Sequence, residues 1–262
     1  MGVTRTPLIA GNWKMNEDHL QAIALVQKLA WTLSEAGHES SDAEVVVFPP
    51  YTDLRSVQTL VAADKLEIGY GAQDLSVHDS GAFTGEISGA FLEKLGCSYV
   101  IIGHSERRQY HNETDELLAQ KVQAALRYGL TPVLCVGETA EDLEKYGASA
   151  VPVAQLRGAL AGFPVDAPLV VAYEPVWAIG SGKAATAEQA GEVATVLRST
   201  LTELLGADAA ERTRILYGGS VKKANIAGFM AQRDVDGALV GGASLDADEF
   251  AGIAQFSKHI TV

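Results

Sequence analysis

Eight short apolar segments spaced along the whole chain constrain its fold more than any other feature. Each is bounded by turn residues and lacks the regular alternation that would leave one face in water. Such continuously apolar runs are typical of parallel strands buried on both faces. The predicted strands are residues 8–10, 44–48, 66–70, 99–102, 132–136, 169–173, 214–217 and 238–240.

Amphipathic segments lie between these strands, with apolar residues three and four positions apart, as in helices that cover a core. The clearest are residues 18–36, 114–128, 186–205 and 248–258. Strand and helix alternate without a linker, which favours one α/β domain over residues 1–262. A doubly wound sheet is an alternative, but eight strands in about 250 residues match a single (β/α)8 barrel. We therefore expect eight parallel strands surrounded by helices.

The excess of acidic over basic residues makes some classes of binding partner improbable. The 262 residues include 33 Asp or Glu and 20 Lys or Arg, which gives a formal charge of −13. An acidic surface opposes binding to nucleic acid and to anionic lipids. No apolar run approaches the ~20 residues that cross a bilayer, and the N-terminus has no signal-peptide pattern. We expect a cytoplasmic protein without a nucleic-acid or membrane partner.

The cysteines and histidines give no sign of a metal or redox centre. Cys97 and Cys135 lie in apolar stretches and are too few for a disulfide scaffold, so reduced core thiols are expected. The six histidines show no ligand-like pairing on a helix. We expect no metal and no cofactor.

Polar side chains follow three of the predicted strands, at the ends where a parallel barrel has its active site. Asn12 and Lys14 follow the first strand. His104 and Glu106 follow the fourth, and Glu174 follows the sixth. Within each pair the residues are two apart, so extended backbone would place both side chains on the same side. A cation, an imidazole and carboxylates should therefore meet at one face of the barrel.

Glycine pairs follow the seventh and eighth strands, at residues 218–219 and 241–242, directly before predicted helices. Backbone N–H groups at a helix N-terminus bind anions, and barrels commonly hold phosphate after these two strands. The pattern predicts a phosphorylated substrate. Residues 175–185 include Trp177 and Ile179 and are too apolar for a passive exposed loop, so we interpret them as a lid over a ligand.

Each of these features also has a structural explanation when it is taken alone. A histidine in an apolar stretch is usually a hydrogen-bonded core residue, and Glu174 could cap a helix. Lys14 could extend its stem along apolar surface, and the double glycines could be turns. Their convergence on one barrel face is harder to obtain from structural residues and favours a catalytic site.

Four motifs resemble the triosephosphate isomerase family and occur in that family's order. They are Gly-Asn-Trp-Lys at residues 11–14, Ile-Gly-His-Ser-Glu at 102–106, Tyr-Glu-Pro-Val-Trp-Ala-Ile-Gly at 173–180 and Tyr-Gly-Gly-Ser at 217–220. The resemblance covers essentially the full chain. It implies a TIM barrel that interconverts dihydroxyacetone phosphate and D-glyceraldehyde 3-phosphate, a step of glycolysis and gluconeogenesis.

The resemblance also implies roles for single residues. Glu174 would remove the proton next to the carbonyl, and a neutral His104 would donate a hydrogen bond to the developing enediolate oxygen. Lys14 would add positive charge, and Asn12 would help to polarise the substrate oxygen. Glu106 would position Lys14 through a charge-assisted hydrogen bond.

By the same resemblance, four backbone N–H groups would hold the substrate phosphate: those of Gly180, Ser220, Gly241 and Gly242. Residues 80–86 resemble the family's protruding third loop, so a homodimer is expected through the loop around Phe83 and Thr84. Thr84 would then support the partner subunit's Asn12 and Lys14.

Three positions depart from the family's usual pattern. Asp74 stands where many members have Asn, and Ser181 and Ala184 replace threonines that are common in the lid. These departures leave the chemistry intact and bear on the interface and the lid.

Two other functions use the same residues. A Schiff-base aldolase would keep the phosphate site and use Lys14 as the nucleophile. A catalytically silent barrel could serve as a binding or surface protein, although Glu174 and His104 argue against it.

Overall fold

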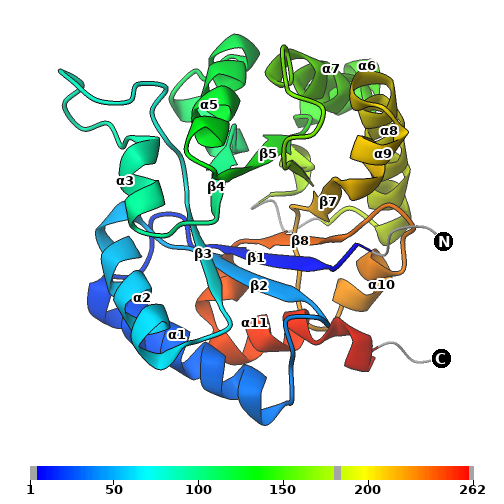
Figure 1. The fold of residues 1–262 in the computed structure, drawn as a ribbon. Helices are drawn as coiled ribbons and strands as arrows, with labels where there is room; N and C mark the ends of the chain where they lie inside the picture. Colours follow the sequence, from blue (N-terminus) through cyan, green and yellow to red (C-terminus); the bar gives the residue numbers. More distant parts are fainter. Residues whose placement is uncertain (1–4, 180–183, 260–262) are drawn as a thin grey trace.

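The computed structural model describes residues 5–179 and 184–259, and its strands form a closed barrel in chain order (Figure 1). All neighbouring strands are parallel, and β1 closes the barrel by pairing with β8. The expected (β/α)8 barrel is confirmed. The strands are β1 (Leu8–Asn12), β2 (Glu44–Phe48), β3 (Gly69–Ala72), β4 (Tyr99–Ile102), β5 (Thr131–Val136), β6 (Val170–Tyr173), β7 (Arg214–Tyr217) and β8 (Gly237–Val240).

Helices surround the barrel on its outside (Figure 1). The α-helices are α1 (His19–Glu35), α2 (Tyr51–Asp64), α3 (Gly89–Lys94), α4 (Ser105–Tyr110), α5 (Asp115–Arg127), α6 (Ala140–Tyr146), α7 (Ala150–Ala159), α8 (Ala187–Leu205), α9 (Ala207–Arg212), α10 (Ile226–Met230) and α11 (Ala247–Ala254). Short 3-10 helices are η1 (Val176–Ala178), η2 (Gly242–Leu245) and η3 (Phe256–His259). Among the described helices, none combines the length and the apolar character that a membrane crossing requires.

Local sequence explains where the long helices begin. Asp18 caps α1 by accepting the backbone N–H of Gln21, whose side chain in turn accepts the backbone N–H of Asp18. Thr186 and Gln189 form the same reciprocal capping box at the start of α8. Each box satisfies N–H groups that a helix end leaves without intrahelical partners.

Three predicted elements have wrong boundaries. The first strand ends at Asn12 rather than at residue 10, because Gly11 and Asn12 also pair with β2. The third strand is Gly69–Ala72 rather than residues 66–70, because Gly69 and Tyr70 are the residues that pair with β2. Two of its four residues are glycines, which strands disfavour, and a Cβ at Gly71 would lie 2.5 Å from the Tyr99 carbonyl oxygen. The last predicted helix, residues 248–258, is instead α11 followed by η3.

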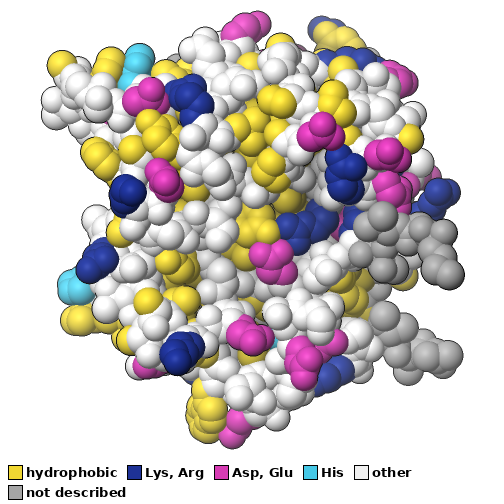
Figure 2. Space-filling view, in the orientation of Figure 1, with side chains coloured by type: hydrophobic (Ala, Val, Ile, Leu, Met, Phe, Trp, Pro, Cys, Tyr) yellow, Lys and Arg dark blue, Asp and Glu magenta, His cyan; other side chains and the backbone are white. Residues whose placement is uncertain are grey.

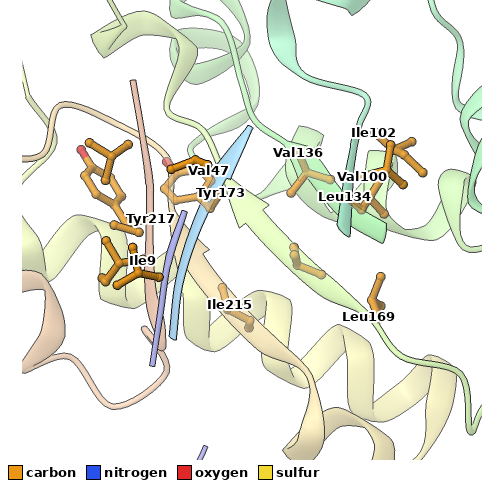
Figure 3. Packing of buried hydrophobic residues seen from close by; sticks show 14 of the residues in the cluster. Ile9, Val47, Val100, Ile102, Leu134, Val136, Leu169, Tyr173, Ile215 and Tyr217 are labelled. Carbon is orange, nitrogen blue, oxygen red and sulfur yellow. The ribbon is translucent and has the colours of Figure 1, made fainter. Parts of the chain in front are cut away.

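Both faces of the strands are buried, as their continuous apolar character predicts. Along β1, Leu8 and Ala10 belong to one cluster of buried residues, and Ile9 belongs to the other. Figure 3 shows part of this second cluster, in which Ile9, Val47 and other residues labelled there pack together. Alternation of this kind is how a barrel fills its interior and also packs its helices. Cys97 and Cys135 are buried free thiols.

Charged side chains occupy the end of the barrel at which the strands begin. The Tyr99 hydroxyl donates to Glu44 Oε1 at 2.7 Å, and Arg214 Nη1 lies 2.6 Å from Glu44 Oε2. These contacts join β2, β4 and β7 across the barrel. A cavity lies at the opposite end, where polar residues follow the strands.

Candidate active site

A cavity of about 300 Å³ lies at the carboxyl ends of the strands. Ten of the residues that the sequence singled out line it: Asn12, Lys14, His104, Glu174, Ile179, Gly218, Gly219, Ser220, Gly241 and Gly242. Glu106 does not line the cavity but contacts Lys14. Gly180 lies outside the described residues, so its predicted contact with phosphate stays a prediction. The strand ends therefore bring together side chains that are far apart in the sequence.

The backbone at Lys14 is not extended, contrary to the sequence expectation. Lys14 has a φ of 54°, in the left-handed region that residues with a Cβ seldom adopt. Its N–H donates to Asn12 Oδ1 at 3.0 Å, and its carbonyl oxygen accepts from Gln73 Nε2 at 2.7 Å. Hydrogen bonds on both sides of the residue thus hold a conformation that the chain alone disfavours.

The prediction of extended backbone between His104 and Glu106 is also wrong. His104 is the N-cap of α4, and Glu106 lies in the first turn of that helix. His104 Nδ1 accepts the backbone N–H of Glu106 at 3.2 Å, because a helix begins with N–H groups that need acceptors. This bond places the proton of a neutral imidazole on Nε2, the nitrogen that faces Glu174.

The predicted hydrogen bond between Lys14 and Glu106 is present. Lys14 Nζ lies 2.6 Å from Glu106 Oε1, although the two residues are 92 positions apart. A Cβ placed on Gly241 would lie 3.7 Å from Lys14 Cε. The lysine stem therefore passes close to the glycine loop after β8, which brings a cation beside the predicted phosphate site.

Glu174 is the acidic residue that lines the described cavity, and only 2% of its surface is exposed. Oε1 lies 2.9 Å from His104 Nε2, and Oε2 accepts the backbone N–H of Ser105 at 3.0 Å. Gly218 borders this side chain, since a Cβ there would lie 2.9 Å from Glu174 Cγ. The Glu174 carboxylate is therefore buried and hydrogen-bonded through both oxygens. The absence of a side chain at Gly218 leaves space for the Glu174 side chain.

A model of the triosephosphate isomerase family matches residues 7–257. The chain belongs to the triosephosphate isomerase family. It is 68% identical over 256 residues to triosephosphate isomerase of Leifsonia xyli subsp. xyli, covering 98% of this chain and 99% of that protein. It is 58% identical over 255 residues to the Streptomyces avermitilis protein of the same name, covering 97% and 98% of the two chains. The strand-end motifs thus belong to a match over nearly the whole chain.

Glu174 and His104 shift each other's protonation within this family site. Burial by itself would raise the pKa of Glu174, but His104 and the Ser105 N–H lower it below its ordinary value. Burial would lower the pKa of His104, but the Glu174 carboxylate raises it above its ordinary value. The contact with Glu174 therefore stabilises the charged form of His104, whereas the family resemblance implies a neutral ring during catalysis.

The glycine pairs differ from the expected helix starts. No α-helix directly follows Gly218 and Gly219, since the next one, α10, begins at Ile226. After β8, Gly242 begins the 3-10 helix η2, whose N-cap is Gly241. Both loops line the cavity. A phosphate there would meet loop and 3-10 backbone rather than the N-termini of long helices.

The apolar side chains after Glu174, which the sequence predicts to be exposed unless they cover a ligand, are partly buried against the protein itself. Trp177 and Ile179 are half-buried, and Trp177 Nε1 donates to Glu138 Oε1 at 2.6 Å. The Tyr173 hydroxyl donates to the same oxygen at 2.9 Å. Glu138 was not singled out from the sequence, because no local pattern joins it to residues 35 and 39 positions away. The lid interpretation stays a prediction.

The departures from the family pattern occupy different environments. Asp74 is buried and pairs with Lys121 and Arg107. Ala184 is exposed, and Ser181 lies outside the described residues. Across residues 5–179 and 184–259, no group of three or more His, Cys, Asp or Glu side chains is arranged to hold a metal ion.

Proposed function

We propose that this protein interconverts dihydroxyacetone phosphate and D-glyceraldehyde 3-phosphate, the reaction of its family. The observation that best supports this proposal is the contact between buried Glu174 and His104 in a cavity that Lys14 also lines. A base, a hydrogen-bond donor and a cation are the groups that proton transfer next to a carbonyl needs. The proposal also assigns a role to each of these residues.

Glu174 is the base. It removes a proton from the carbon beside the carbonyl and returns it to the neighbouring carbon, so that no atom of the substrate is lost. Its burial makes the carboxylate a stronger base once His104 no longer stabilises its charge. The carboxylate therefore leaves His104 and the Ser105 N–H when it turns toward the substrate.

His104 is the hydrogen-bond donor. When Glu174 turns away, the larger of the two carboxylate contributions that raise the pKa of His104 is removed, and burial, which lowers that pKa, favours the neutral ring. The Glu106 N–H on Nδ1 keeps the remaining proton on Nε2, where it is available to the enediolate oxygen. Turning of the base thus supports the neutral donor that the sequence resemblance implies.

Lys14 and Asn12 stabilise the negative charge that develops on the substrate, and Glu106 fixes Lys14. Ser220, Gly241 and Gly242 hold the phosphate together with Gly180, which the sequence assigns to the same role. Exclusion of water by residues 175–185 would protect an enediol phosphate from losing phosphate.

The test compares Glu174→Gln with Asp234→Asn. Asp234 is a buried carboxylate beside Arg198 that precedes β8, at the barrel end opposite the cavity. In a coupled dehydrogenase assay with dihydroxyacetone phosphate, Glu174→Gln should lower kcat by at least ~10² to 10⁴, the usual contribution of a general base. Asp234→Asn should keep wild-type kcat. An inactive but folded wild type, or an active Glu174→Gln, would refute the proposal.

The aldolase alternative gains no support from the site. Lys14 lies in an ion pair with Glu106 rather than in the apolar or cationic surroundings that activate Schiff-base lysines. Borohydride in the presence of dihydroxyacetone phosphate should leave Lys14 unmodified. A covalent adduct on Lys14, detected by mass spectrometry, would favour the aldolase.

We also propose a homodimer through the loop around Phe83 and Thr84, residues 80–86. This exposed segment between β3 and α3 extends away from the barrel (Figure 1), and hydrophobic side chains and a histidine gather at the corresponding corner of the surface (Figure 2). Phe83 is 41% exposed, and Met15, next to Lys14, is 94% exposed. Exposed apolar side chains of this kind favour an interface. In this arrangement Thr84 supports the partner subunit's Asn12 and Lys14.

Sedimentation tests the dimer. Phe83→Asp should shift the protein toward a monomer, whereas Tyr146→Asp, at an exposed aromatic residue on α6, should not. A monomeric wild type would refute the proposal. We further propose that residues 1–262 form one domain and that the protein acts in the cytoplasm.

A further inference from the structure

Four charged side chains form a cluster outside the cavity, which we call the Asp74 cluster: Asp74, Glu113 and Lys121 are buried and Arg107 is half-buried. Lys121 Nζ lies 2.6 Å from Asp74 Oδ1 and 2.6 Å from Glu113 Oε1. Arg107 Nη2 lies 2.9 Å from Asp74 Oδ2, and its Nε lies 2.8 Å from Glu113 Oε1. Two cations therefore face two carboxylates.

The cluster joins the two segments that hold Lys14. Asp74 follows Gln73, whose amide donates to the Lys14 carbonyl oxygen at 2.7 Å. Arg107 follows Glu106, whose carboxylate lies 2.6 Å from Lys14 Nζ. Asp74 is therefore next in sequence to the residue that holds the Lys14 backbone. Arg107 is next in sequence to the residue that holds the Lys14 side chain.

Helix α4 needs such a link. It has only six residues, and a helix of that length has too few internal hydrogen bonds to fix its own orientation. Its position, and with it that of Glu106, depends on tertiary contacts. Arg108 ties α4 to the Gly103 and Cys135 carbonyl oxygens, and Arg107 ties it to the end of β3 through Asp74.

Stability does not explain a carboxylate at position 74. Burial raises the pKa of Asp74 above its ordinary value even though Lys121 and Arg107 oppose the shift, so the ionised form is costly there. A buried ion pair often gives no net stabilisation over a neutral arrangement. An uncharged Asn at this position would avoid this cost, so the charge calls for another explanation.

We propose that Asp74 is a positioning residue that holds Arg107, and through it Glu106 and Lys14, in the geometry that the catalytic cavity requires. The proposal rests on the proposed isomerase function. Asp74 does not line the cavity, so it acts through these neighbours rather than on the substrate. The carboxylate accepts from Lys121 and Arg107 together, whereas the amide of Asn has only one acceptor oxygen.

The test measures steady-state kinetics and thermal unfolding of Asp74→Asn against Asp234→Asn. The two wild-type side chains are 11% and 9% exposed, and each contacts an arginine, but Asp234 lies at the opposite end of the barrel. Asp74→Asn should lower kcat/KM about tenfold, within the ~10² that a 1 Å misplacement can cost. Asp234→Asn should leave kcat/KM unchanged. If the wild type is active and Asp74→Asn has the same kcat/KM, the inference about Asp74 is overturned but the proposed function is not. An inactive wild type would refute the proposed function.

A double-mutant cycle separates positioning from a general loss of structure. If Asp74 acts through Glu106, Asp74→Asn should cause no further loss of kcat/KM in a Glu106→Gln background. Additive losses would overturn the proposal. Should Asp74→Asn fail to fold, Arg107→Lys keeps the positive charge but cannot reach both carboxylates with a planar fork. It should show the same tenfold loss, and wild-type kinetics in that variant would also overturn the proposal.

Discussion

Gly218 makes room for the catalytic carboxylate, and adding one methyl group there should test how closely Glu174 is positioned. In Gly218→Ala the new Cβ would lie 2.9 Å from Glu174 Cγ and 3.1 Å from the Tyr173 carbonyl oxygen. Carbon atoms in ordinary contact are about 3.5–4.0 Å apart, so the two carbons must separate by roughly 0.6–1.1 Å. The Tyr173 carbonyl belongs to β6, which makes the Glu174 side chain the group that moves.

A displacement of about 1 Å at a catalytic group can cost ~10² in rate, or about 2.7 kcal/mol of transition-state stabilisation. We expect Gly218→Ala to lower kcat for dihydroxyacetone phosphate by about this factor. Overpacking should also lower the free energy of unfolding by about 1–3 kcal/mol.

Gly228→Ala is the matched control. It adds the same methyl group in α10, where the nearest atom would be a Cβ at 3.7 Å, and alanine favours a helix. Its kcat should equal that of the wild type. The coupled assay and thermal unfolding are measured for both variants, and a kcat for Gly218→Ala within twofold of wild type would refute the steric argument.

Three further predictions concern stability. Burial alone would raise the pKa of Glu113, but the two cations of the Asp74 cluster lower it below its ordinary value. Its ionised form therefore adds stability that is complete above the unfolded-state pKa and lost as the pH falls through the folded-state pKa. Urea unfolding between about pH 6 and pH 3 should show a weaker pH dependence in Glu113→Gln, and an equal slope would contradict this. Trp177→Phe removes a donor from the buried Glu138 carboxylate and should lower the free energy of unfolding by about 1–3 kcal/mol, so an unchanged urea midpoint would count against the contact. Asp18→Ala removes the N-cap of α1 and should cost about 1 kcal/mol in the same experiment, whereas a neutral effect would show that the cap does not stabilise the helix.

The barrel could be predicted because buried parallel strands leave a strong local signal. Strands such as Glu44–Phe48 and Tyr99–Ile102 have the predicted bounds, since their apolar residues are contiguous. The third strand is predicted three residues too early. Gly69 and Gly71 carry no strand preference, whereas the neighbouring Leu66 does. Pairing with β2, which no local pattern shows, decides its position.

The candidate site was predicted in composition but not in local geometry. Strand ends identified which polar residues meet, because all parallel strands end at one face. The backbone at Lys14 and the helix that begins after His104 were missed, since hydrogen bonds from Gln73 and Glu106 decide them. Contacts such as Lys121 with Asp74 join residues 47 positions apart and leave no trace in either neighbourhood.

Closure of the barrel has a consequence for how the protein is made. Strand β1 pairs with β2 and also with β8, and the β1–β8 register joins Leu8 to Gly237 and Gly11 to Val240. A chain emerging from the ribosome exposes one edge of β1 until β8 has been synthesised. Asn12 lies on that strand, and Gly241 and Gly242 directly follow β8. The cavity is therefore completed by the same event that removes the last unpaired strand edge, so partly synthesised chains expose an edge and lack a complete site.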